Sequence, residues 1–265
     1  AAALPRHALV LVGLVVMLWG FSIFARTLPT PAILGVWLLL AAVMVESLLP
    51  RRRLRRRIWL NACLRSASVW HGRLRGGLVM GAFQWLKALL LSALLLGVLV
   101  RVDDPSQWRL LMVGALLLVL IRAWFHRGLM GDLNPGFRPE PVWRASLWCA
   151  GAVLVALLAV LALLRAQPDF TEASLAQAVW HQIDQEVARS AFLQEALRIL
   201  AAKEGLQFWL GQHVSGLPLA GGPVVVVVWL LIFLEQGLFA AALMILFSGA
   251  LSRLPPDALV GHHAG

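Results

Sequence analysis

The sequence predicts an all-α integral membrane protein with several spanning helices. Apolar residues make up 60% of its 265 residues and charged residues 14%, whereas soluble domains typically have about 45–50% and about 25%. The mean hydropathy of +0.81 agrees with this class. The apolar residues fall in runs long enough for helices that cross a bilayer. We therefore expect a polytopic protein with six transmembrane helices, over roughly 8–25, 31–49, 77–100, 109–125, 145–164 and 223–249.

The distribution of charge predicts how these helices are oriented. Six of the seven residues from Arg51 to Arg57 are arginine, and short basic loops stay on the cytoplasmic side of a membrane. Alternation from this loop places both termini in the cytoplasm and the connection 165–222 outside. That connection has four basic and six acidic residues, as an outer segment should. We expect a multi-pass protein of a bacterial inner (plasma) membrane with no nucleic-acid partner.

This topology divides the chain into four parts. A five-helix region, 1–164, contains the basic cytoplasmic connection 50–76. The extracytoplasmic connection 165–222, the sixth spanning helix at 223–251 and a cytoplasmic tail at 252–265 follow. Within the basic connection, residues 58–75 mix tryptophan, leucine and valine with arginine, which fits an amphipathic segment on the inner leaflet and an ordinary linker helix equally well.

The outer connection predicts an amphipathic helix. The stretch from Asp169 to Glu172 matches a capping pattern at a helix start, and apolar residues recur every four positions from Leu175 to Val187. We expect a helix over roughly 171–203, a break at Gly205 and a short apolar piece at 206–210. This segment is too polar to span, so it caps the bundle or docks a partner.

Two ionisable residues lie deep inside apolar runs. Lys87 is about 15 Å from the cytoplasmic start of the third run, and Glu235 is about 17 Å from the outer start of the sixth. Both therefore fall near the middle of a hydrocarbon core about 30 Å thick, where a charge costs about 2.5–3.5 kcal/mol. We predict that they form a buried ion pair. The predicted intramembrane polar layer comprises Lys87, Glu235, Gln84 and Gln236.

This predicted layer has two interpretations. Intramembrane ionisable residues often mark pathways for ions, protons or substrates. A buried pair also holds helices in register, although desolvation offsets much of its attraction. The sequence leaves both interpretations open.

Two further sets of residues are predicted contacts. Small residues on one face of the sixth run permit close helix packing, and the arginine cluster suits anionic lipid or a cytoplasmic partner. The packing face comprises Gly237, Ala241, Met244 and Ser248. The basic contact comprises Arg51, Arg52, Arg53, Arg55, Arg56 and Arg57.

The sequence lacks the common signatures of catalysis. It contains no HExxH, no GxSxG and no cysteine or histidine spacing typical of zinc. His7, His71 and His126 lie near the ends of apolar runs rather than deep within them, where a membrane haem takes its ligands. We expect no catalytic residue, no metal and no cofactor.

Two functions follow as hypotheses. The first is movement of a small solute, ion or lipid by a transporter or channel component, with the Lys87–Glu235 layer as its constriction or proton-sensitive switch. The alternative is a non-catalytic integral membrane subunit that anchors or assembles a larger membrane complex. A homo-oligomer without a foreign chain would favour transport, and a foreign subunit would favour the alternative. A lipid-modifying enzyme is a third and weaker hypothesis.

Overall fold

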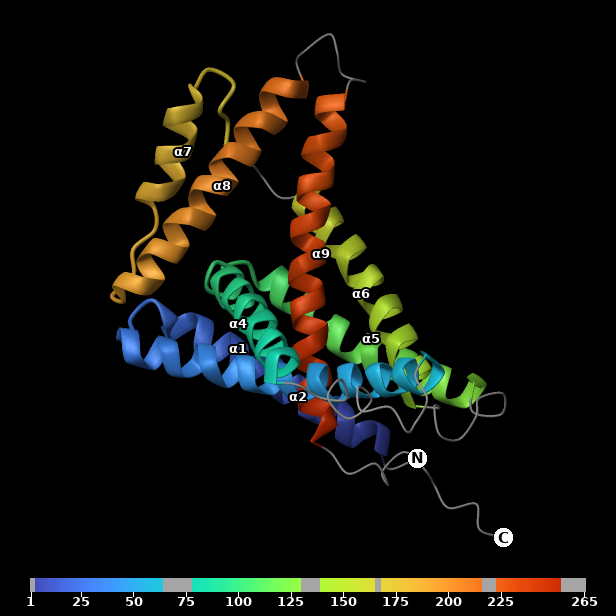
Figure 1. The fold of residues 1–265 in the computed structure, drawn as a ribbon. Helices are drawn as coiled ribbons and strands as arrows, with labels where there is room; N and C mark the ends of the chain where they lie inside the picture. Colours follow the sequence, from blue (N-terminus) through green and yellow to red (C-terminus); the bar gives the residue numbers. More distant parts are fainter. Residues whose placement is uncertain (1–2, 64–77, 130–138, 165–167, 216–222, 254–265) are drawn as a thin grey trace.

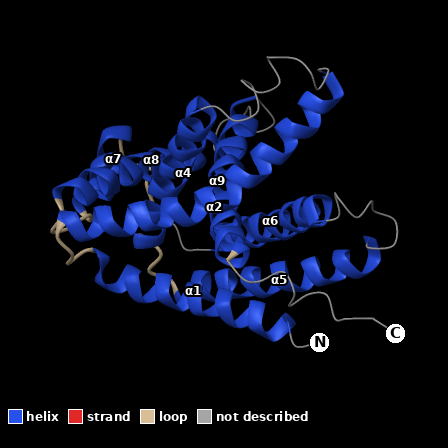
Figure 2. Ribbon diagram, turned by 60° about the horizontal axis from the view of Figure 1, so that its bottom comes forward, coloured by secondary structure: helices blue, strands red, loops and turns tan. Residues whose placement is uncertain are grey.

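The protein is built from helices, as a computed structural model shows (Figure 2). The structure describes residues 3–63, 78–129, 139–164, 168–215 and 223–253, and no strand occurs within these ranges. Its helices are α1 (Ala3–Ala25), α2 (Thr30–Cys63), α4 (Leu78–Val100), α5 (Pro105–Leu129), α6 (Pro139–Leu164), α7 (Leu175–Asp184), α8 (Ala191–Ser215) and α9 (Pro223–Ser252).

Six of these helices are long and apolar enough to cross a membrane. The predicted polytopic helical membrane fold is therefore confirmed. The candidate spans are Leu4–Ala25, Thr30–Leu54, Met80–Val100, Pro105–Gly128, Val142–Ala162 and Phe233–Ser252.

Helix α9 occupies the centre of the bundle (Figure 1). It packs against α1, α2, α4, α6 and α8. Its last five turns bury side chains such as Phe239, Leu243 and Phe247, because a helix that is apolar on every side must be surrounded by other helices or by lipid.

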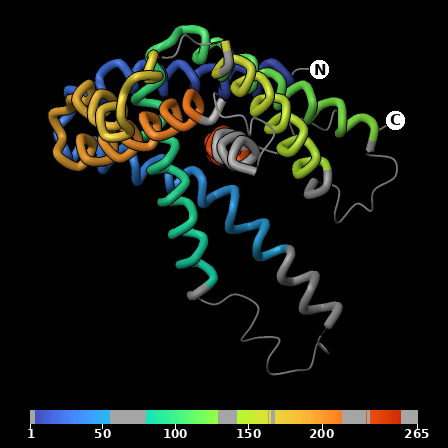
Figure 3. Tube along the Cα trace, turned by 90° about the horizontal axis from the view of Figure 1, so that it is seen from above, coloured from blue at the N-terminus to red at the C-terminus, as the bar shows by residue number. Residues whose placement is uncertain are grey.

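Helix α2 is longer than its apolar run. It continues through Pro50 and the arginine cluster to Cys63, so the first part of the predicted inner-leaflet segment at 58–75 extends α2. Residues 64–75 of that segment lie outside the described part of the chain. Figure 3 shows the C-terminal part of α2 and the N-terminal part of α4 extending together away from the other helices.

The connection between α6 and α9 forms a helical hairpin rather than one long helix. Helices α7 and α8 pack closely, because Gly205 lies where an added Cβ atom would be 2.7 Å from the carbonyl oxygen of Ala178. Because Gly205 has no side chain, the two helices can approach closely at this position. Helix α8 continues through Gly205, contrary to the sequence-based prediction of a break there. The predicted helix over 171–203 was wrong in its bounds, since the chain turns at 185–190.

The start of α7 also differs from the prediction. Ser174 is the capping residue and forms a capping box with Gln177, which satisfies amide groups that the first helical turn leaves free. Asp169 instead accepts hydrogen bonds from the backbone N–H and hydroxyl of Thr171. The hydrogen bond from the Thr171 N–H holds the pKa of Asp169 below its usual value.

Candidate functional site

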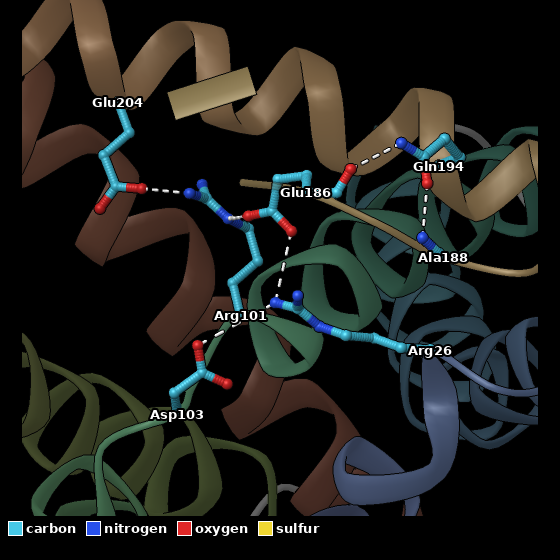
Figure 4. A network of polar contacts seen from close by, with 7 residues as sticks. All are labelled: Arg26, Arg101, Asp103, Glu186, Ala188, Gln194 and Glu204. Carbon is cyan, nitrogen blue, oxygen red and sulfur yellow. Dashed lines mark hydrogen bonds and ion pairs between the residues drawn. The ribbon is translucent and has the colours of Figure 1, made fainter. Parts of the chain in front are cut away.

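Charged residues gather at one end of the bundle, where the short connections 26–29 and 101–104 lie. We call this the turn end. The α7–α8 hairpin covers it, and four residues join the hairpin to α1 and α4 (Figure 4). We call them the arginine–glutamate network: Arg26, Arg101, Glu186 and Glu204.

Glu186 is the centre of this network. Its side chain is only 6% exposed and lies between two guanidinium groups. The Nε atom of Arg101 donates a hydrogen bond of 2.7 Å to one carboxylate oxygen, and Arg26 lies 3.3 Å from the other. That second contact is ionic rather than a directed hydrogen bond. A buried carboxylate requires such partners, because burying an unpaired charge is costly.

Helix α8 connects this network to the central helix. Arg101 also pairs with Glu204 of α8, and the neighbouring Lys203 pairs with Glu235 of α9. The Nε2 atom of Gln207, one turn further along α8, donates a hydrogen bond of 3.1 Å to Glu235. Adjacent residues of one helix therefore fasten α4 on one side and α9 on the other.

This arrangement corrects the predicted Lys87–Glu235 pair. Glu235 is bound to Lys203, whose neighbour Glu204 holds Arg101, so Glu235 lies level with the end of α4. Lys87 is fourteen residues before Arg101, or about 21 Å along the helix, and is out of reach. The prediction assumed that residue 224 marks the membrane interface, whereas the first turns of α9 extend past the ends of the other spanning helices, alongside the C-terminal end of α8 (Figure 1).

The remaining members of the predicted layer are also separate. Gln84 is buried in α4, and Gln236 is partly exposed in α9. Within the described ranges, the structure records no hydrogen bond that joins either glutamine to Lys87 or Glu235. The polar layer predicted at mid-depth is therefore absent from the described part of the bundle.

Lys87 lies on an exposed surface of α4. Phe83, Leu86 and Leu90 around it are also exposed, while Ala88 is buried toward the protein. The structure gives Lys87 no ion pair with any residue that it describes. We call the four residues Phe83, Leu86, Lys87 and Leu90 the α4 face.

The opposite end of the bundle holds the arginine cluster. The Nη2 atom of Arg51 donates a hydrogen bond of 2.6 Å to the hydroxyl of Ser248, and its guanidinium lies 4.6 Å from the ring centre of Trp143. Arg122 lies 4.5 Å from the same ring. Arg51 is thus engaged in helix packing rather than free to contact lipid.

The other arginines differ in their surroundings. Arg52 and Arg53 are exposed, whereas the side chains of Arg55, Arg56 and Arg57 lie outside the described part of the structure. Nearby, Arg253 donates two hydrogen bonds, of 2.6 and 2.7 Å, to the carboxylate of Glu46. These hydrogen bonds raise the pKa of Arg253.

The close packing predicted on α9 occurs one position away from the predicted face. An added Cβ atom at Gly249 would clash with the carbonyl oxygen of Val43, whereas Gly237 has open space around it. Ser248 is buried, but Ala241 is exposed. The predicted packing at Gly237 and Ala241 is therefore replaced by the contact between Gly249 and α2.

The described part of the bundle contains a small hollow. A hollow beside Arg122, between α1, α5 and α9, leaves about 10 Å³ for the centres of water-sized molecules, enough for about one water. It is lined by Leu4, His7, Val119, Arg122, Ala123 and Leu251. The described residues contain no group of three or more side chains suited to hold a metal.

Comparison with protein-family models, with curated proteins and with solved structures finds no match. The six apolar helices give the class. The chain is a multi-pass helical membrane protein.

The sequence reasoning missed the arginine–glutamate network. One signal was present: Arg26 and Arg101 lie in connections that the charge rule predicts to be outside, where short loops are usually poor in arginine. An arginine in such a connection is stabilised when acidic residues on the same side form ion pairs with it, as Glu186 and Glu204 do with these two arginines.

Proposed function

We propose that the chain is a non-catalytic integral membrane subunit that assembles a larger membrane complex. The observation that carries this proposal is the attachment of the α7–α8 hairpin to three spanning helices. Glu186 binds Arg26 of the α1–α2 turn and Arg101 at the end of α4, and Lys203 binds Glu235 of α9. A hairpin held in this way is a fixed platform.

The platform presents apolar side chains on its outer surface. Trp180, Val187 and Ile199 are between 61% and 70% exposed, although they belong to a segment too polar to span a membrane. Large exposed apolar side chains on a non-spanning element are typical of a surface that contacts a protein or the membrane interface. We assign this surface to a second protein of the same membrane.

The transport hypothesis loses its main support. It depended on a charged layer inside the bundle, and the structure pairs Glu235 with Lys203 at the turn end instead. The described core consists of apolar side chains, chiefly leucine, alanine and valine, with methionine and aromatic residues among them.

The proposed location is an inner (plasma) membrane with both termini in the cytoplasm. The joining of connections 26–29 and 101–104 to the α7–α8 hairpin supports the alternation on which this topology rests. The exposed Arg52 and Arg53 would then face the anionic lipids of the inner leaflet.

Native mass spectrometry tests the proposal. The full chain is extracted from its own membranes in mild detergent, and we expect a foreign chain in fixed stoichiometry with it. Ile199→Glu should reduce the bound fraction, whereas Glu195→Gln, also exposed on α8, should not. Recovery of the chain alone, or only with copies of itself, would refute the heteromeric subunit.

A further inference from the structure

We propose that the α4 face is an intramembrane docking surface for a spanning helix of a different protein, and that this helix presents a carboxylate to Lys87. The inference rests on the proposed subunit function and names the chemistry of the partner. It is independent of the α7–α8 platform, because the two surfaces lie at different levels of the molecule.

The position of Lys87 along α4 requires a partner. Lys87 is nine residues after Leu78 and thirteen before Val100, or about 14 Å and about 20 Å from the two helix ends. A lysine side chain extends about 6 Å and carries its charge toward water when it lies near a helix end. Lys87 lies too deep for this, so lipid is an unfavourable environment for its ammonium group.

The surroundings of Lys87 suit a helix. Phe83, Lys87 and Leu90 follow one another at spacings of four and three, which places them in one stripe, and Leu86 widens it. The three apolar members are 54% to 64% exposed. The side of α4 next to this stripe is occupied, since Gln84, one turn before Lys87, and Ala88 are buried and the Trp37 indole of α2 donates a hydrogen bond to the carbonyl of Leu89.

No carboxylate in the described part of the chain pairs with Lys87. The acidic residues of the described spans are Glu46 and Glu235, and both are engaged. Both oxygens of Glu46 accept hydrogen bonds from Arg253, and Glu235 is held by Lys203 and Gln207. A second copy would therefore bring no available acid from its described spans, so the complementary charge comes from another protein.

The α4 face belongs mainly to the N-terminal half of α4. The N-terminal part of α4 and the C-terminal part of α2 extend together away from the bundle (Figure 3). A partner helix against α4 would cover the apolar stripe and neutralise the ammonium group in one contact, as oppositely charged residues do in membrane helix pairs.

The test uses the full chain in its own membranes. Lys87→Leu, Lys87→Glu and Lys87→Arg are extracted in mild detergent and weighed by native mass spectrometry, with Arg127→Leu as a control that removes an exposed positive charge from the end of α5. We expect Lys87→Leu and Lys87→Glu to lower the fraction of chain bound to a foreign subunit by about tenfold or more. Lys87→Arg and Arg127→Leu should leave that fraction unchanged.

A photo-crosslinking residue at Leu90 locates the partner, with one at the exposed Leu120 of α5 as the matched control. We expect Leu90 to crosslink to a foreign spanning segment that contains an aspartate or glutamate, and reversal of that charge should rescue Lys87→Glu. Rescue also distinguishes lost docking from misfolding, because a misfolded chain would not recover.

The outcomes separate this inference from the proposed function. If the wild-type chain carries no foreign subunit, the proposed function fails. If a foreign subunit is bound but Lys87→Leu and Lys87→Glu do not release it, or Leu90 crosslinks to lipid or to a second copy, the docking surface is wrong and the subunit function stands.

Discussion

Lys203 of α8 forms an ion pair with Glu235 of α9, beside the pair that Glu204 makes with Arg101 of α4. Two consecutive residues thus attach one non-spanning helix to two spanning helices. Glu235 is thereby an element of the turn end and not part of a layer inside the bundle.

The pair should be measurable as a coupling free energy. Lys203→Met and Glu235→Gln, singly and combined, should show a coupling of about 1 kcal/mol in the free energy of unfolding in detergent. The value is modest because the two side chains are 36% and 29% exposed, and water screens them. The cycle of Lys87→Met with Glu235→Gln should be additive within about 0.5 kcal/mol, and a larger coupling there than with Lys203 would contradict the structure.

Glu186 should matter more than any exposed acid of the hairpin. Glu186→Gln removes the buried carboxylate that Arg26 and Arg101 share, while Arg101 keeps Glu204 and Arg26 keeps the exposed Asp103 at 4.0 Å. We therefore expect a loss of about 2 kcal/mol in unfolding free energy, the range for charge-assisted hydrogen bonds. Glu195→Gln removes an exposed pair with Arg198 and should cost less than about 0.5 kcal/mol. Equal losses in the two variants would show that the network does not hold the hairpin.

Gly249 and Gly237 should respond to alanine in opposite directions. Gly249→Ala places a methyl group against the backbone of Val43, where neither helix yields easily, and should destabilise the protein by about 3 kcal/mol. Gly237 has nothing within 4 Å of an added Cβ, so Gly237→Ala should be neutral or stabilising by up to about 1 kcal/mol. Thermal unfolding of the two variants in one detergent compares them directly, and a greater loss at Gly237 would restore the originally predicted packing face.

The class of fold was predictable because it depends on composition and run length. Long apolar runs impose spanning helices, since backbone groups within a bilayer must be satisfied inside the segment. The positions of the short turns were predictable from helix-breaking residues such as Pro29 and from charged residues such as Asp103. These signals are local, and the structure agrees with them.

The pairing of charges was not predictable because it depends on how far one helix slides past another. Depth was counted from the end of each apolar run, which placed Lys87 and Glu235 together. The run that contains Glu235 extends beyond the other spanning helices, and the α7–α8 hairpin supplies Lys203 at that level. The hydropathy of a sequence does not show how far one helix is displaced along another, because the valine and leucine residues at 224–234 have the same hydropathy wherever they lie.

Thiol crosslinking tests the location of Glu235 most directly. In a background with Cys63→Ser and Cys149→Ser, the pair Lys203→Cys with Glu235→Cys is compared with the pair Lys87→Cys with Glu235→Cys, using a short bifunctional thiol reagent in native membranes. We predict rapid crosslinking within one chain for the first pair and none for the second. Crosslinking between positions 87 and 235, with none between 203 and 235, would contradict the account and return Glu235 to a charged layer inside the bundle.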